Sequence, residues 1–263
     1  MRINQWILTV CLAVGMLAGT VRQAAADEWK EQQSRHFKVY YKSAPLSFVK
    51  DVETTAERLY EDIARDLGFT RYRGWSFEDQ AKIYIYDDQE DFVNSARGAN
   101  WSHGYASVLE KTIRTFPAAY GFFDSLLPHE MGHIIFREFI GQYVRVPSWF
   151  EEGVAMYQEK GKRWGANKDV RKAIEEGKFI PLSELSIIHL GYNADRSLVD
   201  LFYSESASVV YYMITEFGGY TFVRLCRKLQ EKKSFEQALI EAYPMFKSLN
   251  DLNDRWKEYV QEK

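Results

Sequence analysis

Cysteine is nearly absent from this chain of 263 residues, which contains only Cys11 and Cys226. Two cysteines cannot build the dense disulfide framework that holds small secreted domains together, so the fold must depend on an apolar core. The hydrophobic share of 46% and the aromatic share of 16% are sufficient for such a core. The same shares exclude a disordered chain and a collagen-like chain.

The sequence also lacks an excess of positive charge, an internal repeat and a low-complexity stretch. Its 34 basic and 37 acidic residues give a net charge of −3, and no basic run stands out. We therefore expect no nucleic-acid partner. No linker rich in proline or glycine divides the chain, which favours a single domain over residues 27–263.

The first 26 residues have the composition of a secretory signal peptide. Arg2 gives a positive start, residues 7–18 are almost wholly apolar, and alanines at 24–26 are the small residues that signal peptidase accepts. We expect cleavage before Asp27 and a secreted or periplasmic protein, in which Cys226 is the single cysteine. The alternative is a retained membrane anchor, because residues 3–21 form a run of 19 uncharged residues. Contact with a membrane is expected only in that case.

Strand-like segments come first in the remaining chain, and helix-like segments follow. The hydrophobic periodicity predicts strands at 36–42 and 82–86, helices at 46–67 and from 87 or 88 to about 97, a loop at 98–103, a hairpin of 104–109 and 112–116, and mostly helix from 122 onward. This order predicts an α+β fold with two lobes, a small N-terminal sheet and a mostly helical C-terminal lobe, and argues against a doubly wound parallel sheet. A functional site is expected in the cleft between the lobes.

One segment carries a metal-site pattern, His129-Glu130-Met131-Gly132-His133, which is an H-E-x-x-H motif. On a helix, residues four apart lie on the same face, so both imidazoles can reach one ion. Glu130 lies beside the first histidine and can contact a water bound to that ion. Two histidines need a third ligand to make a catalytic zinc site.

Two adjacent glutamates, Glu151 and Glu152, are candidates for the third ligand. Ser148 is a good N-cap residue, and Glu151 follows it by three, which predicts a capping box that occupies Glu151. Glu152 points about 100° away around the helix and is free to bind the ion. We therefore predict Glu152 as the ligand, with Gly153 leaving space beside the ion.

The motif, eighteen further residues and then Glu152 in WFEEGVA resemble the gluzincin zinc metallopeptidases, both the aminopeptidase N type and the smaller peptidase MA-like domains. The resemblance implies one Zn²⁺ ion held by His129, His133 and Glu152. It also implies hydrolysis of peptide bonds with Glu130 as the general base. Tyr203, which we expect at the opening of a helix, is similar in position to the tyrosine that donates its hydroxyl to the oxyanion in these enzymes.

Two departures from the family pattern affect the expected activity. The aminopeptidases carry a Gly-x-Met-Glu-Asn segment whose glutamate holds the substrate's free amine, whereas residues 104–108 here contain no carboxylate. We therefore expect a peptide or protein substrate but not a strict aminopeptidase. Thermolysin-like relatives have an aspartate four residues after the ligand glutamate, where this chain has Met156, so the groups that support the histidines are not assigned. The alternative is a non-catalytic, metal-containing binding module of the cell envelope, which the intact Glu130 argues against.

Overall fold

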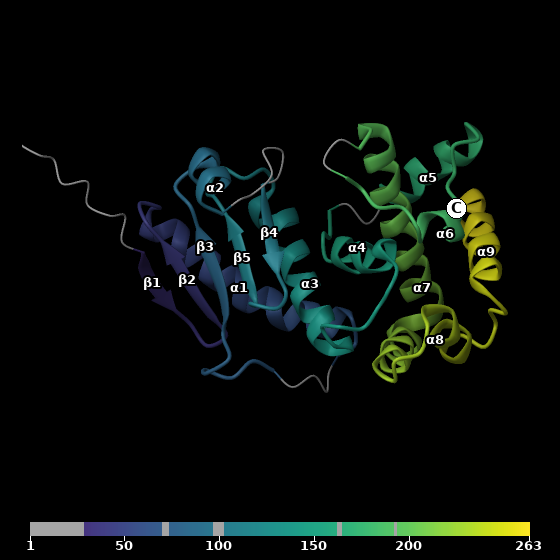
Figure 1. Cartoon of the computed structure of the whole chain (residues 1–263), viewed down its shortest axis with the longest axis horizontal. Helices are drawn as coiled ribbons and strands as arrows, with labels where there is room; N and C mark the ends of the chain where they lie inside the picture. Colours follow the sequence, from purple (N-terminus) through teal and green to yellow (C-terminus); the bar gives the residue numbers. More distant parts are fainter. Residues whose placement is uncertain (1–28, 70–73, 97–102, 162–164, 192–193) are drawn as a thin grey trace, which may run out of the picture.

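The computed structural model describes residues 29–69, 74–96, 103–161, 165–191 and 194–263. The predicted signal peptide and residues 97–102, where the second helix and the following loop were expected to meet, lie outside these ranges. Figure 1 shows a sheet of five strands at one side of the molecule and a group of helices at the other. The strands are β1 (Lys30–Gln33), β2 (Phe37–Tyr41), β3 (Ala81–Ile85), β4 (Gly104–Ser107) and β5 (Thr112–Thr115). The helices are α1 (Leu46–Asp66), α2 (Gln89–Ala96), the π-helix η1 (Phe122–Leu126), α3 (Leu127–Ile140), α4 (Ser148–Tyr157), α5 (Ala166–Glu175), α6 (Leu182–Leu185), α7 (Arg196–Gln230), α8 (Phe235–Ala242) and α9 (Leu249–Glu262).

The predicted order of a small N-terminal sheet followed by helices is confirmed, but the sheet is mixed. Its strand order is β1-β2-β3-β5-β4, with β2, β3 and β5 parallel and the two outer pairs antiparallel. The parallel pairs need crossover connections, which α1 provides between β2 and β3, and α2 followed by β4 provides between β3 and β5. The predicted hairpin of β4 and β5 is present. Strand β1 was missed because its sequence KEQQ is entirely polar and pairs through its backbone at the sheet edge.

One face of the sheet forms the N-terminal core. Along β2 and β3, the side chains of Phe37, Val39, Ile83 and Ile85 point to this face and are fully buried. The apolar face of α1 covers them, and α1 in turn packs against α3. The helix α3 is therefore placed between the sheet and the helical part of the chain (Figure 1).

The apolar pattern of α3 decides which way its polar residues point. Leu127, Met131, Ile134 and Ile135 are fully buried, and their spacing of four, three and one marks a single helix face. Pro128 lies in the first turn, where its missing N–H is tolerated. The other face, which carries the H-E-x-x-H motif, is turned toward α4 and the cleft described below.

The helix α4 packs against α3 on one side and against α7 on the other. At Gly153 the helices α4 and α7 approach so closely that a Cβ atom would lie 2.2 Å from the carbonyl oxygen of Ser206. The prediction that Gly153 leaves space beside an ion is therefore wrong. The residue is glycine because the backbone of α7 occupies the place of a side chain. Among the described residues, no helix is both long enough and apolar enough to cross a membrane.

Candidate active site

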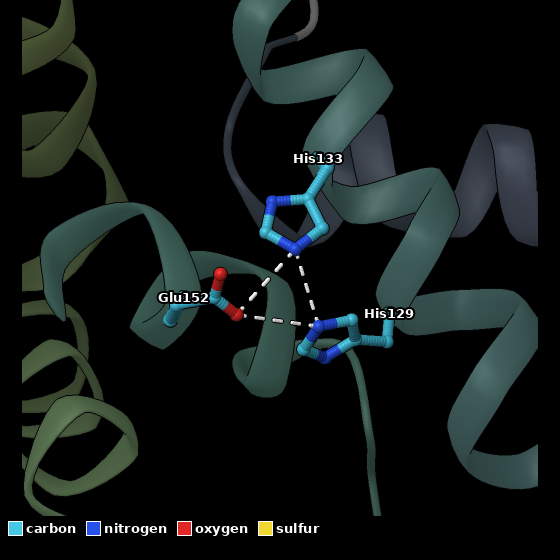
Figure 2. A group of neighbouring side chains, drawn as sticks. All are labelled: His129, His133 and Glu152. Carbon is cyan, nitrogen blue, oxygen red and sulfur yellow. Dashed lines mark hydrogen bonds and ion pairs between the residues drawn. The ribbon is translucent and has the colours of Figure 1, made fainter. Parts of the chain in front are cut away.

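His129 and His133 of α3 and Glu152 of α4 point toward one another (Figure 2). The two Nε2 atoms are 3.1 Å apart. Glu152 Oε2 lies 3.4 Å from His129 Nε2 and 3.5 Å from His133 Nε2. These three side chains form a group that could hold a metal ion.

The size of this triangle fits zinc. Ligands bound tetrahedrally at about 2.0–2.1 Å from zinc are separated by about 3.3 Å, which is close to all three measured sides. Glu152 Oε2 is buried and has no hydrogen-bond partner, which is costly for a carboxylate oxygen unless a cation binds it. Two imidazoles and one carboxylate are also the donor set of many catalytic zinc sites. The residues present therefore fit the metal that the sequence pattern predicts.

Glu159 supports the first histidine, and it was not found by sequence reasoning. The Nδ1 atom of His129 lies 2.9 Å from Glu159 Oε1, and Ser125 Oγ donates to the other oxygen of the same carboxylate. A proton shared with Glu159 at Nδ1 leaves Nε2 with the electron pair that binds a metal. Glu159 lies just beyond the end of α4 at Tyr157, so helical spacing does not reveal its contact with His129.

Glu151 does not cap α4, so the predicted capping box is wrong. Pro147 occupies the N-cap, and Ser148 is the first helical residue without a side-chain cap bond. The carboxylate of Glu151 instead receives two hydrogen bonds from Arg137, one of them 2.5 Å long, and lies 3.8 Å from His133 Nδ1. Arg137 is four residues after His133 on the same face of α3. A bidentate pair with this arginine is stronger than a neutral hydrogen bond to a backbone N–H.

The carboxylates around the two histidines favour positive charge at the centre. Burial lowers the pKa of His129, but Glu152 and Glu159 outweigh it and raise that pKa to about 9. For His133, burial is likewise outweighed by Glu151 and Glu152, and its pKa rises to about 10. Burial raises the pKa of Glu152, but the two imidazoles hold it well below its usual range. The site attracts a cation, whether protons on the histidines or a metal ion.

Glu130 and Tyr203 line the same cleft as His129. The prediction that Tyr203 opens a helix is wrong in detail, because α7 begins seven residues earlier, at Arg196, where the Asp195 side chain caps it. Tyr203 is half-buried, and burial together with the charges of Glu152, Glu130 and Glu159 raises its pKa. Its hydroxyl therefore stays protonated at neutral pH and can donate a hydrogen bond.

The cleft has a volume of about 1070 Å³. One wall consists of His103, Gly104 and Tyr120 from the sheet-bearing part of the chain. The opposite wall comes from α5, the segment after it and the first turns of α7. Of the three metal-site residues, His129 lines this cleft, together with Glu130 and Glu159, so the cleft between the sheet-bearing and the helical part reaches the predicted site.

The sequence model of the Peptidase MA superfamily matches residues 68–262. The chain belongs to the Peptidase MA superfamily. The match includes α3, α4 and α7 and therefore all three elements that form the site. No curated protein matches the chain.

Membership of the Peptidase MA superfamily supports a metallopeptidase-like function, that of a peptidase-type hydrolase. Proteins of this superfamily are typically metal-dependent, in agreement with the group of His129, His133 and Glu152. The match identifies the superfamily but no subgroup within it. It therefore does not support the more specific resemblance to aminopeptidase N and thermolysin.

Proposed function

We propose that this protein is an exported, zinc-dependent peptidase that hydrolyses peptide bonds with Glu130 as the general base. The observation that carries the proposal is the triangle of His129 Nε2, His133 Nε2 and Glu152 Oε2, whose sides of 3.1–3.5 Å match the ligand spacing of tetrahedral zinc. Export is supported by the positive start, the apolar run and the alanines of the first 26 residues.

Zinc held by the three ligands would polarise the scissile carbonyl and lower the pKa of the attacking water. Glu130 follows His129 directly and lines the same cleft, so its carboxylate can accept the proton of that water and pass it to the leaving nitrogen. The protonated hydroxyl of Tyr203 donates a hydrogen bond to the carbonyl oxygen as negative charge develops there. Glu159 keeps the ring of His129 in the orientation and tautomer that ligation requires.

The edge strand β4 supports an extended peptide as the substrate. It is the last strand in the sheet order, and Gly104 at its beginning lines the cleft. An exposed edge strand binds an extended peptide by main-chain hydrogen bonds. Residues 104–108 contain no carboxylate, and the nearby Glu110 is paired with Arg114 at 2.8 Å. We therefore expect N-acetylated peptides to be cleaved at least as well as peptides with a free amine.

The test is the zinc content of the purified protein together with its cleavage of a broad peptide library. The wild type is expected to bind one zinc ion and to cleave library members. Glu130→Gln should keep zinc and lose about 10²–10⁴ in kcat, because the amide cannot accept the proton. Tyr203→Phe should keep zinc and lose about 10²–10³ in kcat.

Two outcomes would contradict the proposal. A wild type without stoichiometric zinc would contradict the metal site, and Glu130→Gln with undiminished kcat would contradict the mechanism. Zinc binding without cleavage of any library member would favour the non-catalytic binding module instead.

A further inference from the structure

Tyr120 is an exposed aromatic side chain at the cleft. Its side chain is 83% exposed, and among the described large apolar residues that are exposed it alone lines the cleft. Single exposed apolar residues elsewhere on a surface need no explanation. An exposed ring in the wall of a catalytic cleft is different, because a bound molecule can cover it.

The backbone that carries Tyr120 is fixed on both sides. Its neighbours Ala119 and Phe122 are buried, at 5% exposure each. The Ala119 N–H donates to the carbonyl of Phe116, and the carbonyl of Gly121 accepts from Ser125 and Leu126. Gly121 has a φ of 63°, in the left-handed region that glycine adopts without strain. The ring of Tyr120 therefore projects from a rigid turn rather than from a loose loop.

The same turn is continuous with the metal site. It leads directly into η1, a π-helix, and then into α3. Short π-helical segments occur frequently at functional sites. Here η1 places Leu126 in the cleft wall and Ser125 on the Glu159 carboxylate. Tyr120 thus holds a defined position relative to His129, nine residues later.

The two walls of the cleft differ in character. Tyr120 shares its wall with His103 and the strand β4, and Leu126 adds an apolar side chain beside the metal-site residues. The opposite wall, from α5, the segment after it and α7, is mixed. It contains the charged residues Asp169, Lys172, Glu176, Lys178 and Asp200 and the apolar residues Ala173, Ile180, Leu198 and Leu201. Of the large apolar side chains in the described lining, Tyr120 alone is exposed, so its ring offers an apolar substrate side chain the most uncovered contact area.

We propose that Tyr120 is a specificity-determining residue, whose ring packs against an aromatic or large aliphatic side chain of the peptide substrate. The inference rests on the proposed function, because it assigns a preference within the same cleft. Tyrosine suits this role, since its ring offers a large contact area while only two side-chain torsions are fixed on binding. An aromatic pair adds about 0.5–1.5 kcal/mol, which corresponds to about twofold to tenfold in affinity.

The test measures binding rather than cleavage. The zinc-loaded Glu130→Gln protein is titrated with blocked hexapeptides of alanine and serine, in which one phenylalanine is placed at each position in turn. One position is expected to favour phenylalanine over alanine by about threefold to tenfold. Adding Tyr120→Ala should reduce that preference to less than twofold, whereas adding Tyr120→Phe should retain it.

Tyr143→Ala is the matched control, because Tyr143 is 86% exposed and is not among the residues that line the cleft. It should leave the preference unchanged. A preference that survives Tyr120→Ala, or a parent protein that binds phenylalanine and alanine peptides equally at every position, would overturn the role of Tyr120 alone. Failure of the parent protein to bind any peptide would overturn the proposed function and this inference together.

Discussion

The close contact of α4 with α7 gives a sharp prediction for Gly153→Ala. The added Cβ would lie 2.2 Å from the carbonyl oxygen of Ser206 and 2.6 Å from a methyl carbon of Val210, whereas real Cβ contacts shorter than 3.0 Å are essentially never found. The oxygen belongs to the backbone of α7, so no change of rotamer relieves the contact. The two helices must move apart by most of an ångström.

The expected cost combines two opposing effects. Overpacking in a filled core costs about 1–3 kcal/mol, and a contact with backbone belongs at the upper end. Alanine gains about 1 kcal/mol over glycine in helix propensity. Gly153→Ala should therefore lower the free energy of unfolding by about 2 kcal/mol. Glu152 lies on α4 and Tyr203 on α7, so a separation of the two helices also moves these side chains apart. The kcat of the proposed peptidase should therefore fall by about 10²-fold as well.

Two other glycines provide graded controls for a urea unfolding series. A Cβ at Gly132 would lie 3.0 Å from Ala155 Cα, while a Cβ at Gly161 would meet nothing within 4 Å. The loss of stability should increase from Gly161→Ala, which should stay within about 0.5 kcal/mol of the wild type, through Gly132→Ala to Gly153→Ala. If Gly153→Ala unfolds at the same urea concentration as Gly161→Ala, the argument from the helix contact is wrong.

Two further predictions concern buried carboxyl groups. Glu159→Ala removes the partner of His129 Nδ1, so zinc affinity measured by competition with a chelator should fall about 10- to 100-fold, and an unchanged affinity would contradict the supporting role. Glu205 is fully buried, one of its oxygens accepts only from the Ile180 N–H, and burial raises its pKa to about 8. Between about pH 5 and pH 8 the Glu205 carboxyl is therefore deprotonated in the unfolded chain but protonated in the folded chain. As pH rises through this range, the free energy of unfolding of the wild type should fall relative to that of Glu205→Gln, by up to about 1.4 kcal/mol per pH unit. Urea midpoints of both proteins at pH 5, 6.5 and 8 provide the comparison, and a constant difference between them would refute the assignment.

The meeting of the two histidines could be predicted from the sequence because it depends on local geometry. His129 and His133 are four apart on one helix, and the helical period alone places both rings on one face. The apolar residues between and around them fix which face is buried. The choice of Glu152 over Glu151 agrees with the group of side chains that the structure brings together, although the capping argument used for that choice was wrong.

Contacts between distant elements were decided only by the tertiary structure. The sequence contains Arg137, Glu151 and Glu159, but no local pattern shows that Arg137 takes Glu151 or that Glu159 meets His129. The glycine at 153 is explained by the backbone of Ser206, more than fifty residues later. The parallel pairing of β2 with β3 likewise depends on how α1 crosses the sheet. Periodicity determines which side of each element is buried, whereas the partner of each polar group depends on how the elements pack, because buried polar atoms must find their hydrogen bonds across those contacts.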